Sequence, residues 1–174
     1  MLPVIVITGP VGVGKSTVAR ALSEKLEHQN ISHALIDMDW LRWLYPAKPE
    51  DRFRVKLGHK NLACLAENYR AEGAKLLLLA DVLESSEDYR AYLEAIPAAR
   101  LTVVRLKADI ATIHKRLRDR ESAETLSWYK ARALELSDLM EARQIGDMVV
   151  DSADMTASQI SEVVWQNLSA RLSL

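Results

Sequence analysis

A glycine-rich stretch near the N-terminus, GPVGVGKST (residues 9–17), combines the residue types that bind phosphate. Glycines let a loop curl so that several backbone N–H groups point at one anion. A lysine in such a loop can reach the β- and γ-phosphates of a nucleoside triphosphate, and the serine after it can bind Mg²⁺ through its hydroxyl. The stretch fits the Walker A pattern G-x-x-x-x-G-K-[ST], in which Lys15 and Ser16 hold those two positions.

The stretch also has the flanks that phosphate binding requires. It follows the apolar run VIVI, which is typical of a buried strand, and it opens an amphipathic helical pattern. The unpaired N–H groups of that helix would face the same anion, which favours a nucleotide-binding loop over a glycine-rich turn without a ligand. The predicted nucleotide-binding residues are Gly9, Pro10, Val11, Gly12, Val13, Gly14, Lys15, Ser16 and Thr17, with Lys15 also catalytic and Ser16 also a metal ligand.

A second group of chemically active residues is DMDWLR (37–42), which follows another apolar run. In extended chain Asp37 and Asp39 share a face, and one helical turn brings Arg42 next to Asp39. A carboxylate beside an acceptor hydroxyl can orient it and take its proton, and an arginine can clamp an anionic acceptor. We predict that Asp39 is catalytic and that Asp37 and Arg42 bind the substrate. The alternative is that Asp39 only caps a helix at 40–45 and Arg42 is solvated.

Two further features could serve phosphoryl transfer. Asp81 ends the apolar run LLLLAD and is predicted to hold a Mg²⁺-bound water, with a turn cap as the alternative. Arg116 and Arg120 lie four residues apart and share a helix face, so we predict them to be catalytic arginines of a short lid at about 116–126. The alternative is a solvated face on which Arg120 pairs with Glu124.

Aromatic residues in and after DMDWLR, and polar residues further along the chain, could line an acceptor pocket. Trp40, Trp43 and Tyr45 could wall it, although a core role fits their residue types equally well. Four polar residues further on could touch substrate, with solvent exposure as the alternative: Arg52, Arg54, Lys56 and His59.

Apolar strand patterns alternate with amphipathic helical patterns along the chain. Strands are predicted at 3–8, 32–37, 75–81, 101–106 and 148–151, and helices after the glycine-rich stretch and at 40–45, 52–72, 86–95, from about 110, 124–143 and 157–171, with a loop at 47–51. This alternation predicts one α/β domain over residues 1–174, with a parallel sheet covered by helices on both faces. Ligands bind beyond the C-terminal ends of such strands, which is where the candidate side chains lie.

Composition narrows the partners and the location. The 174 residues are 49% hydrophobic and 27% charged, with a net charge of −1, so no strong field favours nucleic acid or an anionic membrane. No apolar run approaches the ~20 residues of a membrane span, and the N-terminus lacks the pattern of a signal peptide. The single cysteine, Cys64, is predicted to be a buried reduced thiol, which suits the cytoplasm.

On the Walker A stretch and DMDWLR, the chain resembles the P-loop small-molecule kinases, nearest to the adenylylsulfate kinase-like and chloramphenicol phosphotransferase-like branch. DMDWLR matches the D-x-D-x-x-R motif that this branch carries after its second strand. The resemblance implies a three-layer α/β/α P-loop NTPase fold, strand order 2-3-1-4-5, a catalytic aspartate at 39, an anion-binding arginine at 42 and adenine packing at 151–156. It also implies ATP and Mg²⁺ as cofactors.

The sequence also differs from related families at several motifs. Where adenylylsulfate kinases carry a serine–proline–tyrosine–arginine run, this chain reads ADVLESSEDYR and keeps only Tyr89 and Arg90 of it. The D-G-x-P-R motif of adenylate kinases and the N-K-x-D motif of switch GTPases are both absent from the sequence.

The function that the sequence predicts is an ATP-dependent phosphotransferase that moves the γ-phosphate to a hydroxyl of a small molecule. The small molecule could be anionic, because Arg42 could bind its negative charge. The alternatives are a nucleoside or nucleotide kinase, and a nucleotide-binding regulatory module with little turnover. The identity of the acceptor, the choice between ATP and GTP, and the oligomeric state stay open.

Overall fold

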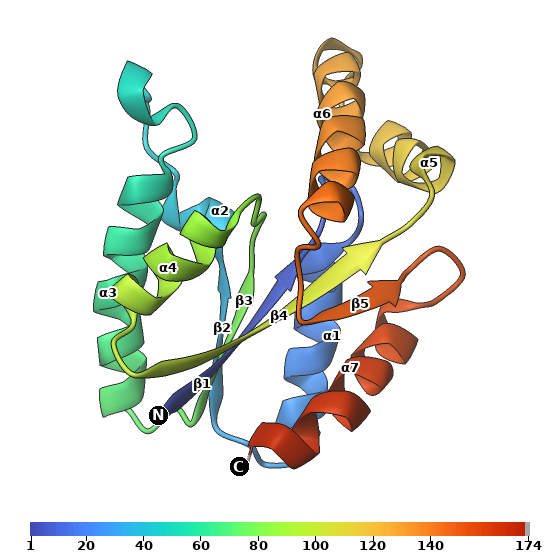
Figure 1. The fold of residues 1–174 in the computed structure, drawn as a ribbon. Coiled ribbons are helices and arrows are strands. Elements are labelled where there is room, and N and C mark those ends of the chain that lie inside the picture. The colour runs from blue at the N-terminus through green and yellow to red at the C-terminus, as the bar shows by residue number, and fades with distance from the viewer. Residues whose placement is uncertain (173–174) are drawn as a thin grey trace.

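The protein is built on a five-stranded parallel sheet, which the computed structural model describes together with its helices over residues 1–172. The strands are β1 (Leu2–Thr8), β2 (His33–Asp37), β3 (Leu76–Ala80), β4 (Ala99–Lys107) and β5 (Met148–Asp151). They lie in the order β2-β3-β1-β4-β5, with every neighbouring pair parallel (Figure 1). The predicted fold class and strand order are therefore confirmed.

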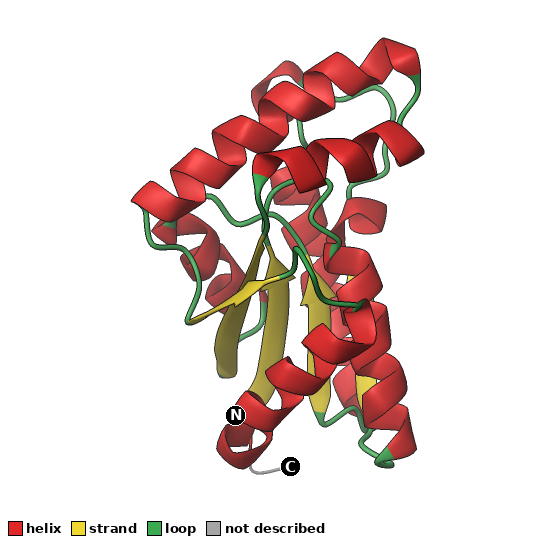
Figure 2. Cartoon of the chain, turned by 90° about the vertical axis from the view of Figure 1, so that its right-hand side faces the viewer, coloured by secondary structure: helices red, strands yellow, loops and turns green. Residues whose placement is uncertain are grey.

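Helices cover both faces of this sheet. They are α1 (Lys15–His28), α2 (Met38–Leu41), α3 (Val55–Ala71), α4 (Ser86–Ala95), α5 (Ile110–Arg120), α6 (Ala123–Ala142) and α7 (Ala157–Leu172), with a 3₁₀ turn at Pro49–Asp51. Helices α1 and α7 pack on one face, and α3 and α4 pack on the other (Figure 1). The turned view in Figure 2 shows the strands enclosed between helices, with further helices above one end of the sheet.

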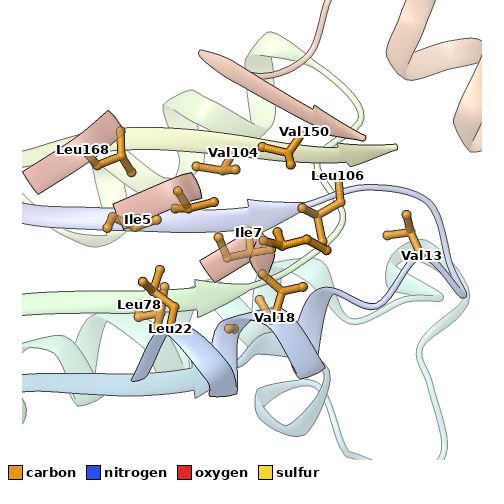
Figure 3. Close-up of a cluster of buried hydrophobic side chains, with 14 of the residues drawn as sticks. Ile5, Ile7, Val13, Val18, Leu22, Leu78, Val104, Leu106, Val150 and Leu168 are labelled. Atoms are coloured by element: carbon orange, nitrogen blue, oxygen red, sulfur yellow. The ribbon is translucent and has the colours of Figure 1, made fainter. Parts of the chain in front are cut away.

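Alternating side chains of the strands build two separate cores. On β1, Ile5 and Ile7 belong to the core under α1 and α7, where Leu22 and Leu168 also lie (Figure 3). Val4 and Val6 belong to the opposite core, which α3 and α4 cover. Strands buried on both faces read as continuous apolar runs rather than as alternating ones, which is why VIVI and LLLL mark the centre of the sheet.

The C-terminal ends of the strands point to one edge, and α2, α5 and α6 stand above it (Figure 1). Three chain segments leave this edge close together: the loop after β1, the turn after β2 and the segment after β3. The Leu83 N–H donates to the Thr8 hydroxyl oxygen at 2.9 Å, which ties the first of these segments to the third.

The helix predicted at 40–45 was placed wrongly. It spans Met38–Leu41, and its N-cap is Asp37, whose carboxylate accepts from the Asp39 N–H at 3.1 Å. The alternative in which Asp39 is the cap is also wrong, because Asp39 lies within the first turn. Both aspartates suit a cap, and the sheet decides between them by ending β2 at Asp37.

The long helix begins later than its predicted start at 52. Its first turn opens at Val55, whose N–H is capped by the Asp51 carboxylate at 2.8 Å, and Arg54 before it has a left-handed φ of 54°. That dihedral interrupts the helix, so Pro49–Asp51 forms a separate 3₁₀ turn inside the stretch predicted as a loop. Cys64, on the outer side of this helix, is exposed, so the prediction of a buried thiol was wrong.

Candidate functional site

The loop between β1 and α1 has the curled backbone of an anion nest. Gly9, Gly12 and Gly14 have φ angles of 146°, 82° and 107°, which other residues rarely adopt. Two of them are also pressed against neighbours: a Cβ on Gly9 would lie 2.5 Å from the Leu106 carbonyl oxygen, and one on Gly12 would lie 2.7 Å from Leu117 Cγ. The N-terminus of α1 opens at the end of this loop, so its free N–H groups serve the same anion.

Lys15, the first residue of α1, folds back over this loop. Its Nζ donates to the carbonyl oxygens of Gly9 at 3.1 Å and Pro10 at 3.2 Å. Withdrawal of the ammonium from water is the main reason why the pKa of Lys15 falls to about 8, against the attraction of Asp39 and Asp81. A phosphate placed beside this desolvated ammonium would strongly stabilise its charged form.

Ser16 and Asp37 form the oxygen pair that best fits a magnesium ion. The Ser16 hydroxyl donates to the Asp37 carboxylate at 2.7 Å, which joins the start of α1 to the end of β2. In residues 1–172 no cluster of three or more His, Cys, Asp or Glu side chains could hold a metal by itself. Mg²⁺ usually keeps several waters and binds one or two protein oxygens plus substrate phosphates, so this sparse pair fits it.

Asp39 lies two residues after Asp37 and is exposed. Partial withdrawal from water raises its pKa, the negative charge of Asp37 raises it further, and Lys15 opposes both. A carboxylate with a raised pKa takes up a proton more readily, which suits a base that must accept one from a hydroxyl.

Arg42 and Asp81 are joined by a buried ion pair. Arg42 Nη2 lies 2.6 Å from Asp81 Oδ2, which also accepts a hydrogen bond from the Tyr92 hydroxyl at 2.5 Å. Burial acts to lower the pKa of Arg42, but the charge and hydrogen bond of Asp81 outweigh it and raise that pKa. Burial and the same carboxylate raise the pKa of Tyr92. The structure therefore links Asp81 to Arg42, whereas Ser16 is linked to Asp37.

Helix α3 is shaped to receive this arginine. A Cβ on Gly58 would lie 2.9 Å from Arg42 Cγ and 3.0 Å from Arg42 Nε, so the arginine stem passes directly over the glycine. Asn61 fixes the approach, because its side-chain amide donates to the Leu41 carbonyl oxygen at 2.8 Å. The sequence reasoning missed both Gly58 and Tyr92. A glycine inside a helical pattern was the available signal for the first, because it costs about 1 kcal/mol unless packing requires it.

One cavity of about 1260 Å³ lies above the C-terminal edge of the sheet. The structure brings most of the predicted site residues into it: Val11, Gly12, Gly14, Lys15, Ser16, Thr17, Asp37, Asp39, Arg42, Asp81 and Arg120. The P-loop and α1 form one side of the cavity. The other side is formed by the segment after β2, the start of α3, the segment after β3 with α4, the end of α5, and α6.

The two predicted lid arginines are separated by the structure. Arg116 donates to the carbonyl oxygens of Val13 at 3.0 Å and Ser152 at 2.7 Å, and within residues 1–172 it is not among the cavity-lining residues. It ties the P-loop to the segment after β5. Arg120 does line the cavity, where it pairs with Glu121 at 2.6 Å rather than with Glu124, and its guanidinium lies 5.9 Å from the Tyr129 ring centroid.

Arg132 is a cavity residue that the sequence reasoning missed. This residue of α6 pairs with Glu84 from the segment after β3 and with Glu135 at 2.8 Å, and it lies 5.9 Å from the Phe53 ring centroid. Glu84 is 48 residues away along the chain. No local pattern signals a pair of that kind, because it depends on how α6 lies over the sheet.

A family model described as "AAA domain" matches residues 5–146 of the chain. No curated protein sequence matches the chain. In the part of the chain that the structure describes, no helix has the length and apolar character to cross a bilayer.

Solved structures of small-molecule kinases and related proteins share the fold. A tunicamycin resistance protein of Deinococcus radiodurans has a TM-score of 0.67 and 20% identity, covering 97% of this chain and 96% of that one. An APS kinase of Mycobacterium tuberculosis, in complex with AMPPNP and APS, has a TM-score of 0.66 and 20% identity, covering 97% and 98%. A shikimate kinase of Bacteroides thetaiotaomicron has a TM-score of 0.66 and 16% identity, covering all of both chains.

Proposed function

Because the chain belongs to the AAA domain family, we propose that it is an ATP-dependent phosphotransferase that moves the γ-phosphate to a hydroxyl of a small molecule. One observation carries the proposal: Asp39 faces the same cavity as Lys15 and Ser16 of the phosphate-binding loop. A carboxylate and a phosphate cradle that share one cavity are the parts that transfer to a hydroxyl requires. The whole chain acts as one kinase domain, with a small-molecule partner and a cytoplasmic location.

The loop at residues 9–17 binds the triphosphate of ATP. Its backbone N–H groups and the N-terminus of α1 surround the β-phosphate, and Lys15 leaves the carbonyl oxygens of Gly9 and Pro10 to contact the β- and γ-phosphates. Ser16 and Asp37 hold Mg²⁺, which when bound neutralises charge on the β- and γ-phosphates.

Asp39 orients the acceptor hydroxyl and takes its proton. The hydroxyl oxygen bonds to the γ-phosphorus as the bond from that phosphorus to the β–γ bridging oxygen breaks, and ADP leaves. Arg120, at the cavity, is placed to stabilise charge on the moving phosphoryl group. Arg116 contributes by holding the P-loop carbonyl of Val13 in place.

Arg42 contributes to acceptor binding, and Asp81 positions it. Asp81 is only 4% exposed and is already engaged by Arg42 and Tyr92, so we replace its predicted metal role with this one. The Asp81 carboxylate offsets the positive charge of Arg42, and the ion pair holds the Arg42 guanidinium at the cavity.

The experiment is a screen for phosphoryl transfer from γ-labelled ATP to a panel of hydroxyl compounds, followed by Asp39→Asn on the best acceptor. We expect transfer to fall at least about 100-fold, the lower range for loss of a general base, while nucleotide affinity stays unchanged. Asp138→Asn, at an exposed position of α6 outside the cavity, is the matched control. Unchanged transfer in the Asp39 variant would remove the base assignment.

A further inference from the structure

Aromatic side chains are concentrated around the cavity. The sequence contains four tryptophans, five tyrosines and one phenylalanine, and seven of these ten residues line this one space. One of them, Tyr92, lies at its buried floor. The other six form what we call the aromatic wall: Trp40, Trp43, Tyr45, Phe53, Trp128 and Tyr129.

The aromatic wall is open to water in the structure. Trp40, Trp43 and Tyr45 are 70%, 78% and 89% exposed, and the two tryptophan rings stack on each other with centroids 5.2 Å apart. Large apolar surfaces left in water mark sites that a ligand or partner covers. Here the exposed rings belong to the same cavity as Lys15 and Asp39, so the occupant that covers them is a molecule bound for the reaction.

The charged groups on this side of the cavity are largely committed to each other. Arg42 is paired with Asp81, and Arg132 with Glu84 and Glu135. Arg54 also lines the cavity, and its buried Nε has no hydrogen-bond partner among the described residues. The Arg54 guanidinium therefore remains available to a polar group of the acceptor, and apolar contact supplies much of the remaining recognition.

The adenine site predicted from the sequence lies apart from the aromatic wall. Residues 151–156, where adenine packing is predicted, are absent from the cavity lining within residues 1–172. The cavity of about 1260 Å³ also exceeds the roughly 300–1,000 Å³ that one drug-sized ligand occupies. It has room for a triphosphate together with a bulky acceptor.

We propose that the acceptor is a hydroxyl-bearing molecule with a flat aromatic body. Its ring system packs against the aromatic wall, and one hydroxyl reaches Asp39. Aromatic rings prefer stacked or edge-to-face contact with such a body, which fixes its orientation as well as its affinity. This inference rests on the proposed phosphotransferase function and names the chemical class of its substrate.

Binding is measured first, without turnover. Three of the four tryptophans belong to the aromatic wall, so intrinsic fluorescence reports its occupation. The protein is saturated with Mg·AMPPNP and titrated with phenyl β-D-glucoside, D-glucose and D-gluconate. We expect the phenyl glucoside to bind at least about ten-fold more tightly than the other two. Equal affinities, tighter binding of gluconate, or no binding of the phenyl glucoside would overturn the inference.

Variants then test which residues make the contact. Trp43→Ala and Tyr45→Ala should raise KM for phosphorylation of the phenyl glucoside about ten-fold and leave KM for ATP unchanged. Tyr69→Ala removes an exposed tyrosine outside the cavity and should change neither constant. If Trp43→Ala instead weakens ATP binding, the wall holds the nucleotide base and the inference is wrong.

The two levels of the account fail differently. If Mg·ATP does not bind at all, the proposed function falls and this inference falls with it. If Mg·ATP binds and phosphate moves to gluconate but not to the phenyl glucoside, the phosphotransferase stands and only the aromatic acceptor is refuted.

Discussion

The two sides of the cavity are built in different ways. The nucleotide side is one continuous stretch, residues 9–17, whose shape comes from its own backbone and whose lysine bonds to its own carbonyl oxygens. The acceptor side is assembled from distant parts of the chain, through pairs such as Arg42 with Asp81, 39 residues apart, and Arg132 with Glu84. A loop that binds through its backbone binds the same ligand wherever its motif occurs. A site assembled from side chains can instead be altered one residue at a time to bind a new acceptor.

The largest effect on ligand binding is expected on the nucleotide side, from Gly9→Ala. The new Cβ would lie 2.5 Å from the Leu106 carbonyl oxygen at a φ of 146°, so the loop must move away from its phosphate-binding shape. We expect Mg·ATP binding to be lost and the free energy of unfolding to fall by about 3 kcal/mol, measured by calorimetry and urea denaturation.

Gly73→Ala is the control for that loss. Gly73 also has a positive φ, 89°, but nothing lies within 4 Å of its Cβ position. We expect a cost of only about 1 kcal/mol and normal nucleotide binding. Equal losses in both variants would mean that strain rather than the clash explains the result.

The largest effect on stability is expected on the acceptor side, from Asp81→Ala. Removing the carboxylate leaves Arg42 charged and buried without its partner, which should lower the free energy of unfolding by about 3–5 kcal/mol. Nucleotide affinity should change little, because Asp81 is tied to Arg42 and Tyr92 rather than to Ser16. A selective loss of Mg²⁺ dependence would instead return Asp81 to the metal role predicted from the sequence.

Gly58→Ala should separate folding from acceptor binding. Alanine stabilises a helix interior by about 1 kcal/mol relative to glycine, but here its Cβ meets the Arg42 stem at 2.9 Å. We expect KM for the acceptor to rise about ten-fold as Arg42 is displaced, at unchanged nucleotide affinity. In an Arg42→Ala background the same substitution should become stabilising, which urea denaturation can measure. Failure of that reversal would show that Gly58 serves a different neighbour.

The smallest effect is a pH dependence confined to the nucleotide side. The pKa of Lys15 is about 8 in the free protein, and bound phosphate favours the charged form and raises it. Binding is therefore strongest below pH 8 and weakens as the pH rises above it, and at pH 8 it should take up about half a proton. Calorimetry in two buffers with different heats of ionisation measures that uptake. No uptake at pH 8 would place the pKa of Lys15 outside this range.

The same contrast explains how much could be predicted from the sequence. The sheet, its strand order and the phosphate loop follow from local apolar runs and one contiguous motif. The approach of Arg42 to Asp81, the hydroxyl of Tyr92 and the pairing of Arg132 depend on how helices pack over the sheet, which no single segment encodes. The helix cap at Asp37 was missed for a smaller reason, since Asp39 offers the same chemistry two residues later.

Arg116 shows the limit of reasoning from helix faces. The spacing of four correctly places Arg116 and Arg120 on one side of α5, yet one reaches the Val13 and Ser152 carbonyls and the other reaches the cavity. A long side chain near a helix end can reach in different directions along the axis, so a shared face does not mean a shared target.

The central claim is that the backbone amides of residues 9–17 hold a triphosphate. Isothermal titration of the protein with Mg·ATP, beside Lys15→Ala and the exposed-site control Lys60→Ala, tests it most directly. We predict one site per chain, an affinity about 30-fold weaker in Lys15→Ala through the loss of ~2 kcal/mol of charged hydrogen bonding, and an unchanged affinity in Lys60→Ala. Absence of binding heat from the unmodified protein, or equal affinities in all three, would contradict the account.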